Sequence, residues 1–311
     1  MSDQETKYDV IIIGAGPAGY TAGIYCSRAR HNTLLISGIL PGGQLMNTTD
    51  VENYPGFDQG IMGPDLMITM RKQTEKMGTK IIDDVVTSVD FKNSPLKVTT
   101  ASNTFEASSV IVCTGANPRK IGLEGEQTFA GKGVSYCATC DGAFFKNQEL
   151  IVVGGGDSAM EEATFLTKFA STVHIVHRKD KFRASKIMQE RALSNEKIKV
   201  HFNHTVEDIQ GDQKFQKVIL KNVKNDEKTL LEAGGLFVAI GHEPNSKIFE
   251  GQIELDENGY VILKNNTETS VPGVFCAGDV HDHRYRQAVT AAGFGCMAAI
   301  DVDKYLTESK N

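Results

Sequence analysis

Two cysteines separated by two residues are the side chains of this sequence best suited to chemistry. They are Cys137 and Cys140, and Asp141 directly follows the second of them. A C-x-x-C pair can close a disulfide with little backbone movement, and one of its thiols can have a lowered pKa. A carboxyl group beside the pair can protonate a leaving thiolate or accept a proton from a thiol. The spacing therefore indicates redox chemistry, with Asp141 as a general acid–base.

Two other interpretations of the pair compete with the redox one. A structural zinc site needs four ligands and usually shows a second C-x-x-C or a nearby pair of histidines. The sequence has no second C-x-x-C, and His174 and His177 belong to a different motif. Two inert cysteines that pack as small hydrophobic side chains would also fit. Redox chemistry is favoured, because a C-x-x-C in a reducing compartment is seldom a structural staple. We expect no metal.

Two segments share one pattern, an apolar run followed by a glycine-rich turn and then by a helical periodicity. The first has its apolar run at 8–13, its turn at 14–19 and its helix at 20–30. The second has them at 150–153, 154–159 and 160–170. Further strands are expected at 32–36 and 172–176. Unbroken apolar runs suit strands that are buried on both faces of a parallel sheet. The sequence predicts an α/β fold with two Rossmann-like nucleotide-binding domains.

The order of these elements predicts that the second domain is inserted into the first. A meander of strand-like stretches follows the second unit between 200 and 240, and a helical pattern at 287–305 would complete the first domain. Two breaks that contain Gly and Pro lie at 114–118 and 241–245, as linkers often do. We expect a discontinuous first domain of residues 1–117 and 248–311, and an inserted domain of residues 118–247.

The glycine turns are expected to bind dinucleotides. Glycines let the backbone approach a pyrophosphate, and the helix that follows supplies free N–H groups and a positive dipole end. Such folds usually carry an acid at the end of the second strand to hold the ribose. The first unit has Ser37 and Gly38 there, so something else must recognise its adenosine, and the loop at 41–44 can wrap a large cofactor.

The second unit has a basic cluster at 177–183, where the acid would otherwise stand. Positive charge at that place suits the 2′-phosphate of NADPH, whereas a carboxylate suits the free hydroxyl of NADH. A solvated basic loop is the alternative. Asp279 also ends a strand, shortly before the helical pattern at 286–288. It can bind a ribityl or ribose hydroxyl, and the helix N-terminus can stabilise a reduced flavin; an ordinary turn residue is the alternative.

Taken together, these motifs resemble the low-molecular-weight thioredoxin reductases over nearly the whole chain. The resemblance is carried by residues 14–19, 42–44, 52–56, 137–142, 154–163, 177–184, 278–279 and 286–288. It implies a homodimer, noncovalently bound FAD, NADPH as electron donor and thioredoxin as the protein disulfide substrate. It also implies that Cys140 faces the flavin, that Cys137 exchanges with thioredoxin, and that Asp141 is the acid.

The resemblance assigns cofactor contacts residue by residue. For FAD they are Gln44, Asn53, Val86, Asp279, Arg286, Gln287 and Ala288; for the 2′-phosphate they are Arg178 and Arg183. The other candidate cofactor-binding residues are Gly14, Ala15, Gly16, Pro17, Ala18, Gly19, Gly42, Gly43, Gly115, Gly154, Gly156, Asp157, Ser158, Ala159, His177 and Lys179. Lys179 departs from the family, which often has Arg there. Lysine keeps the charge but loses the bidentate fork, so it weakens the preference for NADPH.

The expected reaction begins with hydride transfer from NADPH to the flavin, from which electrons pass to the disulfide at Cys140. The Cys137 thiolate then attacks the thioredoxin disulfide, and Cys140 resolves the mixed disulfide. Cys140 lies 14 positions before Gly154, so the pair belongs to the NADPH domain, and that domain would have to swing between two poses. A flavoenzyme for a small dithiol or another redoxin shares these motifs. A nucleotide-binding sensor without turnover is the rival of another class.

Composition limits the remaining classes of function. The 311 residues allow two domains, and 40% hydrophobic with 23% charged residues is ordinary for a globular protein. Net charge is −6 and no dense Lys/Arg block occurs, so nucleic acid is not an expected partner. The polar start at 1–7 lacks the apolar region of a signal peptide, and the apolar runs are strand-sized. We expect a cytoplasmic protein without a membrane partner.

Overall fold

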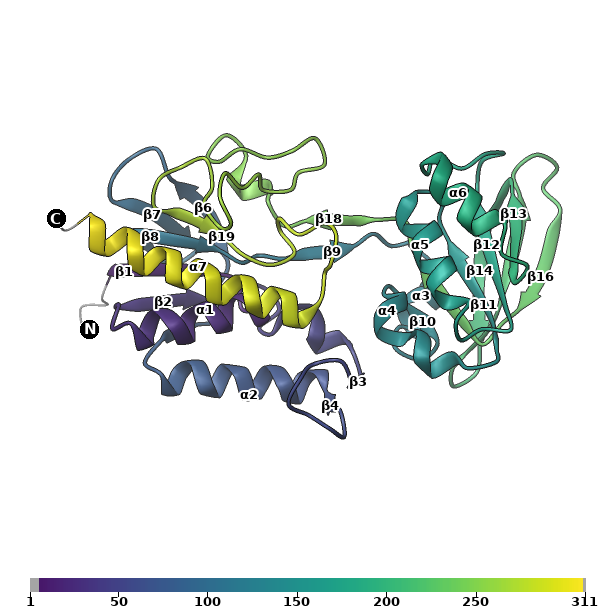
Figure 1. The fold of residues 1–311 in the computed structure, drawn as a ribbon, viewed down its shortest axis with the longest axis horizontal. Helices are drawn as coiled ribbons and strands as arrows, with labels where there is room; N and C mark the ends of the chain where they lie inside the picture. Colours follow the sequence, from purple (N-terminus) through teal and green to yellow (C-terminus); the bar gives the residue numbers. More distant parts are fainter. Residues whose placement is uncertain (1–5, 310–311) are drawn as a thin grey trace. The chain divides into compact units, whose positions relative to one another are not determined.

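The structure is a computed structural model that describes residues 6–309 (Figure 1). The chain divides into two compact units, the first made of Met1–Asn117 and Glu243–Asn311, the second of Pro118–His242. The second unit is therefore inserted into the first. Each passage of the chain between the units includes a short strand, β9 (Ala116–Pro118) or β18 (His242–Pro244), and these two strands pair with each other.

The first unit contains a mixed sheet with the order β5-β2-β1-β8-β7-β6, and β19 also pairs with β8. Its strands are β1 (Lys7–Ile13), β2 (Thr33–Ile36), β5 (Lys80–Ile82), β6 (Val86–Asp90), β7 (Leu96–Thr100), β8 (Thr104–Val112) and β19 (Val274–Cys276). The pairs among β5, β2, β1, β8 and β19 are parallel, whereas β6 and β7 form an antiparallel extension. The unit also contains η1 (Gly43–Asn47), β3 (Asp50–Val51), β4 (Ile61–Met62), η3 (Lys247–Phe249), α1 (Pro17–Arg28), α2 (Gly63–Lys76) and α7 (Ala288–Glu308).

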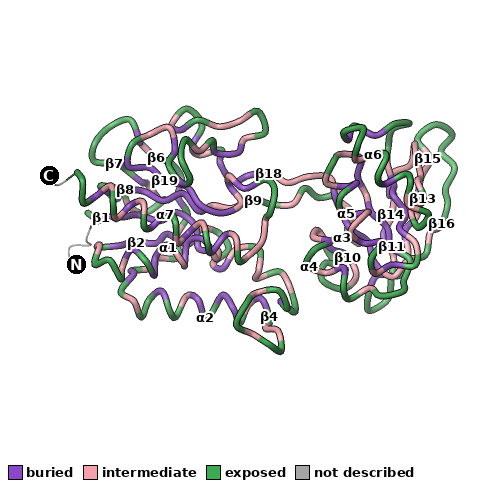
Figure 2. Tube along the Cα trace, viewed as in Figure 1, coloured by how far each residue is buried: buried purple, intermediate pink, exposed green. Residues whose placement is uncertain are grey.

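The centre of this sheet is buried on both faces, as its unbroken apolar sequence predicts. Val10, Ile11 and Ile12 are fully inaccessible to solvent, and Figure 2 shows β1 and β8 buried along most of their length. Ile12 packs on the side of α1 and α7, while Ile11 packs into a second cluster with Phe249. Helices α1 and α7 pack against each other, which gives the C-terminal helix a place in the first unit.

The second unit repeats the same plan around a parallel sheet with the order β10-β17-β11-β12-β13. These strands are β10 (Val134–Ser135), β17 (Gly235–Val238), β11 (Glu149–Val153), β12 (Thr172–His177) and β13 (Ile198–Phe202). An antiparallel sheet is formed by β14 (His204–Gly211), β15 (Phe215–Asn222) and β16 (Lys228–Glu232). The helical segments are α3 (Glu124–Thr128), α4 (Ala138–Asp141), η2 (Gly142–Phe145), α5 (Asp157–Leu166) and α6 (Lys186–Leu193).

The predicted α/β class with two βαβ units is confirmed, with differences in the bounds. Both first helices begin three residues earlier than expected, at Pro17 and Asp157, because Gly16 and Gly156 act as their N-caps. The glycine turn is thus already the start of the helix. The second unit ends at His242 rather than at residue 247. Asn245 belongs with the first unit, because its amide N–H donates to the Gly115 carbonyl oxygen at 2.9 Å.

Candidate functional site

The cysteine pair forms a closed disulfide at the start of α4. The Cα atoms of Cys137 and Cys140 lie 5.3 Å apart. Cys137 is the N-cap of α4, and its Sγ accepts a hydrogen bond from the Cys140 amide at 3.2 Å. Cys137 is half-buried and Cys140 is exposed. A sulfur that accepts a backbone N–H at a helix start has its thiolate stabilised, so the geometry favours Cys137 as the better thiolate of the reduced pair.

Asp141 is held next to the pair by a buried serine. The Ser135 hydroxyl donates to Asp141 Oδ2 at 2.6 Å, and the Cys137 amide donates to the same Ser135 oxygen at 3.0 Å. Burial raises the pKa of the Asp141 carboxyl, and the Ser135 bond lowers it in part. A carboxyl with a raised pKa keeps its proton at higher pH, as a general acid requires. The position suits the role predicted for Asp141.

The first glycine turn lies where the carboxyl ends of several parallel strands meet. Ile13 at the end of β1 is in register with Ile36 of β2 and with Val112 of β8, and Val112 is in register with Cys276 of β19. The segments that follow these strands therefore share one edge of the sheet. Open α/β sheets bind their ligands at this edge. The edge gathers Gly14, Ser37, Gly115, Gly278 and Asp279, which are far apart in the sequence.

Each glycine of this first turn has its own structural reason. Gly14 has φ +109°, and a Cβ there would collide with the Cys113 carbonyl oxygen. A Cβ on Gly19 would collide with the Gly14 carbonyl oxygen, so Gly19 allows α1 to approach the strand end closely. Gly16 differs, because a Cβ there would meet nothing within 4 Å. Gly16 thus borders open space at the helix N-terminus, as the close approach of a pyrophosphate requires.

The loop after β2 packs directly against this turn. The Gly42 amide donates to the Ala15 carbonyl oxygen at 2.9 Å, and a Cβ on Gly43 would lie 3.5 Å from Gly16 Cα. Gln44 Nε2 donates to Asn117 Oδ1 at 2.7 Å. Of the other turn residues predicted to bind cofactor, Pro17 is the first residue of α1, and the Ala18 side chain contributes to the core of the first unit.

Apart from Asp279, the remaining predicted FAD contacts lie on three further segments of the first unit. Asn53 Nδ2 donates to Gln287 Oε1 at 3.4 Å, which joins the loop at 52–58 to the N-cap of α7. That loop lines a hollow of about 460 Å³. Arg286 has φ +48° and donates its amide to Asp282, and Ala288 is the first residue of α7. Val86 is buried at the start of β6.

Asp279 supplies a direct test of whether a cofactor with hydroxyl groups fits this edge. Its Oδ1 is buried and has no hydrogen-bond partner among the described residues. Burial and then the Asp282 carboxylate raise the pKa of Asp279 to about 7, while Arg286 lowers it. Buried polar atoms are nearly always paired, so this carboxyl group fits a donor from a bound molecule. Thr114 Oγ1, which follows β8 at the same edge, is also buried without a partner in residues 6–309.

The second glycine turn follows β11 in the same way. A Cβ on Gly154 would collide with the Ala239 carbonyl oxygen, and one on Gly155 with the His177 ring. Gly156 is again the open position, where a Cβ would meet only the Arg183 guanidinium, at 3.5 Å from Nε. Ala159 is fully buried and takes the place of the third glycine. Ser158, which lies between them, is half-buried in the first turn of α5.

The predicted phosphate-selecting loop is tied to this turn by its backbone. The Arg183 and Ala184 amides donate to the Gly155 carbonyl oxygen at 2.9 and 3.2 Å. Asp157, predicted to bind cofactor, directs Oδ1 to Ser185, whose amide and hydroxyl donate to it at 2.8 and 2.9 Å. Its carboxylate therefore positions the loop. Arg183 lies beside the open Gly156, so this arrangement places a guanidinium at the expected nucleotide-binding turn.

The charged residues of this loop face solvent, whereas the histidine does not. Arg178, Lys179 and Arg183 are exposed. His177 packs its ring on Gly155 and donates from Nε2 to the Lys181 carbonyl oxygen at 3.1 Å. Burial lowers the pKa of His177, and the nearby Arg178 and Lys179 charges act in the same direction. His177 is therefore neutral near pH 7 and supports the turn by packing rather than by charge.

Sequence reasoning did not identify four residues that hold these sites together. Ser135 bonds Asp141, Ser185 bonds the second turn, and Asn117 Nδ2 donates to Asn245 Oδ1 at 2.9 Å. Asn245 Nδ2 in turn donates to the Thr114 carbonyl oxygen at 2.9 Å. In the sequence, only their proximity to a motif could have indicated these four residues, because serine and asparagine are common in loops of every kind.

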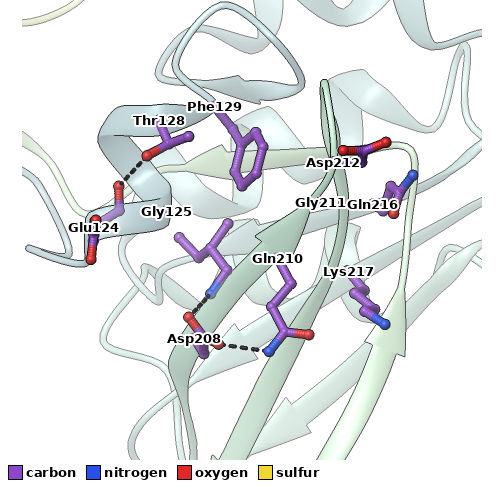
Figure 3. Close-up of a pocket in the computed structure, with 11 residues that line it drawn as sticks. Glu124, Gly125, Thr128, Phe129, Asp208, Gln210, Gly211, Asp212, Gln216 and Lys217 are labelled. Atoms are coloured by element: carbon purple, nitrogen blue, oxygen red, sulfur yellow. Dashed lines mark hydrogen bonds between the residues drawn. The ribbon is translucent and has the colours of Figure 1, made fainter.

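One hollow in the second unit lies away from the predicted site residues. It measures about 520 Å³ between α3 and the β14–β15 hairpin, and Figure 3 shows its lining side chains. None of its lining residues is a predicted site residue. Its Asp208 carboxylate accepts from the Ile209 amide and from Gln210 Nε2, both in the same strand.

Two kinds of site are not found in the described part of the chain. Residues 6–309 contain no group of three or more His, Cys, Asp or Glu side chains that could hold a metal ion. Within the same range, none of the helices combines the length and the apolar character needed to cross a membrane.

Similarity to known proteins extends along nearly the whole chain. Residues 8–295 match the family described as pyridine nucleotide-disulphide oxidoreductase. The sequence is 54% identical over 301 residues to a thioredoxin reductase of Streptomyces clavuligerus, with 96% of this chain and 94% of that protein covered. It is also 54% identical to a thioredoxin reductase of Rickettsia felis, over 304 residues and with 96% and 98% covered.

Solved structures agree with the sequence matches. A thioredoxin reductase from Giardia duodenalis superposes with a TM-score of 0.94 at 43% identity, covering 98% of this chain and 100% of that one. A thioredoxin reductase from Streptococcus pyogenes gives 0.93 at 42% identity, with the same coverage. This chain belongs to the pyridine nucleotide-disulphide oxidoreductase family and, within it, to the thioredoxin reductases.

Proposed function

We propose that the chain carries electrons from NADPH through FAD and the Cys137–Cys140 disulfide to the disulfide of a thioredoxin. The observation that carries this proposal is the closed disulfide at α4, with a half-buried carboxyl of raised pKa in the same hydrogen-bonded unit. A structural staple would not need a proton donor beside it. The two open glycines at the helix starts, Gly16 and Gly156, supply the expected places for two pyrophosphates.

FAD is assigned to the first unit and NADPH to the second. In the first unit, the turn at 14–19 would hold the pyrophosphate, and Asp279 Oδ1, which has no hydrogen-bond partner among the described residues, would accept from a hydroxyl of the cofactor. Gln44, Asn53 and Gln287 would complete that site. Bound FAD supplies the two-electron chemistry that links a nicotinamide to a disulfide. In the second unit, the exposed Arg178, Lys179 and Arg183 would bind the 2′-phosphate.

The residues of this chain then handle sulfur and protons. Opening of the disulfide at Cys140 releases the Cys137 thiolate, to which Asp141 gives its proton. Asp141 later takes a proton back, and the Cys140 N–H steadies the thiolate on Cys137. The Cys137 thiolate attacks the disulfide of thioredoxin, and Cys140 resolves the mixed disulfide.

Several finer points belong to the same proposal. The pair lies in the second unit and the assigned FAD site in the first, so we expect the second unit to move during turnover. The enzyme is expected to act as a cytoplasmic homodimer. A small dithiol or another redoxin is the alternative substrate, since the motifs are shared by such enzymes.

An anaerobic titration of the purified yellow protein with NADPH, followed by addition of oxidised thioredoxin, tests the proposal. We expect the flavin absorbance to bleach with NADPH and to return when thioredoxin is added. Cys140→Ser should still bleach but should not pass electrons to thioredoxin. Cys296→Ser, at an isolated half-buried cysteine, is the matched control and should behave as the parent protein does.

Three outcomes would reject the assignment. Retained thioredoxin turnover in Cys140→Ser would remove the pair from the reaction. Bleaching by NADPH with recovery only on addition of a different redoxin or a small disulfide would favour the alternative substrate. A nucleotide-binding sensor without turnover would show no bleaching.

A further inference from the structure

Ser135 lies two residues before the redox pair, and its hydroxyl has three partners; the Cys137 carbonyl oxygen, at 3.4 Å, is the more distant of its two acceptors. It is 4% exposed at the end of β10. Its O–H donates to Asp141 Oδ2 at 2.6 Å, and its oxygen accepts the Cys137 amide N–H at 3.0 Å. A hydroxyl can donate once and accept as well, so one side chain serves both groups. The Ser135 hydroxyl thus connects the acid to the backbone of the proposed nucleophile.

We propose that Ser135 is a positioning residue for proton transfer, whose hydroxyl fixes the Asp141 carboxyl relative to the Cys137 sulfur. This inference rests on the proposed function, because it assumes that the disulfide is reduced and reformed. Ser135 touches neither cofactor nor substrate in this role and acts through Asp141. It goes beyond the motif, since the C-x-x-C-D pattern contains no serine.

The proton balance gives the hydroxyl a specific task. When two electrons enter the pair and the sulfur–sulfur bond breaks, the Cys137 thiolate takes one proton from Asp141, and Asp141 becomes a carboxylate. That carboxylate is half-buried, and a buried charge is costly without a hydrogen-bond donor. The short Ser135 bond supplies the donor, because charge-assisted O–H···O⁻ bonds are the strong ones. When Cys137 is deprotonated again, its proton returns to the Asp141 carboxylate.

Among residues 6–309, no charged side chain contributes to the pKa shift of Asp141. The raised pKa of Asp141 has burial as its larger cause, and the Ser135 bond is the one that opposes it. Helix α5, which packs against α4, carries Asp157, Glu161 and Glu162, and none of these contributes to the shift. Removal of the Ser135 hydroxyl should therefore move the pKa of Asp141 further up, with no compensating charge.

The test compares Ser135→Ala with Ser135→Thr, which keeps a hydroxyl at the same Cβ, and with the exposed control Ser171→Ala. In Ser135→Ala we expect thioredoxin turnover at pH 7 to fall about tenfold, the loss typical of a hydrogen bond to a charged group. The limb of its pH profile that reports the titration of Asp141 should move up by about one unit. Ser135→Thr should recover most of the rate, and Ser171→Ala should match the parent.

A second readout separates this role from a structural one. The rate at which iodoacetamide alkylates the reduced pair, measured against pH, reports the thiolate directly. Its profile should change in Ser135→Ala but should not change further when Ser135→Ala is added to Asp141→Asn. Unchanged profiles in Ser135→Ala, or equal losses in Ser135→Ala and Ser135→Thr, would overturn the inference. Bleaching of the flavin by NADPH should stay normal in every variant; its absence in the parent protein would instead reject the proposed function.

Discussion

The two open glycines allow a paired experiment on cofactor binding. Gly16 and Gly156 are the N-caps of α1 and α5, with φ −80° and −98°, which any residue can adopt. A methyl group on Gly16 would meet nothing within 4 Å of protein. Gly16→Ala should therefore fold normally and fill the space that we assign to the FAD pyrophosphate. Gly156→Ala should also fold normally, and it should fill the space that we assign to the NADPH pyrophosphate without weakening FAD binding.

The sizes of the two effects follow from this geometry. Alanine is the poorer N-cap by about 1 kcal/mol, but loss of glycine's freedom in the unfolded chain returns about 0.4–1 kcal/mol. The free energy of unfolding of the cofactor-free protein should thus change by less than about 1 kcal/mol. A displaced pyrophosphate loses at least one charge-assisted hydrogen bond, worth about 1.5–3 kcal/mol. The dissociation constant for FAD should rise roughly 10- to 150-fold in Gly16→Ala.

The assay has two parts, and a variant that we expect to be destabilised serves as its control. Urea unfolding of the flavin-free protein measures stability, and quenching of flavin fluorescence measures affinity. Gly19→Ala is the control, because its Cβ would collide with the Gly14 carbonyl oxygen and should lower stability by about 1–3 kcal/mol or more. Parental FAD affinity in Gly16→Ala, or weaker FAD binding in Gly156→Ala, would refute the assignment of these two positions.

Three further outcomes are expected. The flavin-free protein should lose stability as pH rises from about 4 to about 7, because folded Asp279, with its pKa raised to about 7, keeps its proton where the unfolded chain does not. Urea unfolding at pH 5 and 7.5 measures this loss, and Asp279→Asn should reduce it by about 1–2 kcal/mol. An identical loss of stability in both proteins would contradict the prediction. Ser185→Ala should raise the Michaelis constant for NADPH several-fold and that for NADH less, because Ser185 ties the basic loop to Asp157; equal effects on both nucleotides would count against a positioning role. Arg183→Ala should raise the Michaelis constant for NADPH by about tenfold and that for NADH less, in the same steady-state assay. A loss confined to NADH would exclude Arg183 from the 2′-phosphate site.

Local sequence patterns were enough to predict the fold. An unbroken apolar strand, a glycine turn and a helical period specify a βαβ unit without knowledge of distant residues, because each is a short-range property of the chain. The pattern also indicated which strands are buried on both faces. It placed the helix starts three residues late, because a pattern of side chains does not show that Gly16 and Gly156 are already N-caps.

The redox pair was also identifiable from spacing alone, since a C-x-x-C brings its own two sulfurs together. The groups that control it were not, because they depend on contacts between separate elements. The sequence shows that Asp141 follows Cys140, but only the folded chain brings the Ser135 hydroxyl to its carboxyl and buries it enough to raise its pKa. A pKa depends on burial and on partners in space, neither of which spacing in the chain determines.

The same division holds at the nucleotide sites. Sequence alone determined that two glycine turns open two helices, and that one is followed by basic residues. Tertiary structure decided that Asp279 Oδ1 lies buried without a hydrogen-bond partner in residues 6–309, that Asp157 binds Ser185, and that His177 packs on its turn instead of carrying charge. Backbone turns are specified by neighbouring residues, whereas burial and hydrogen-bond partners are specified by which distant strands end at the same edge of the sheet.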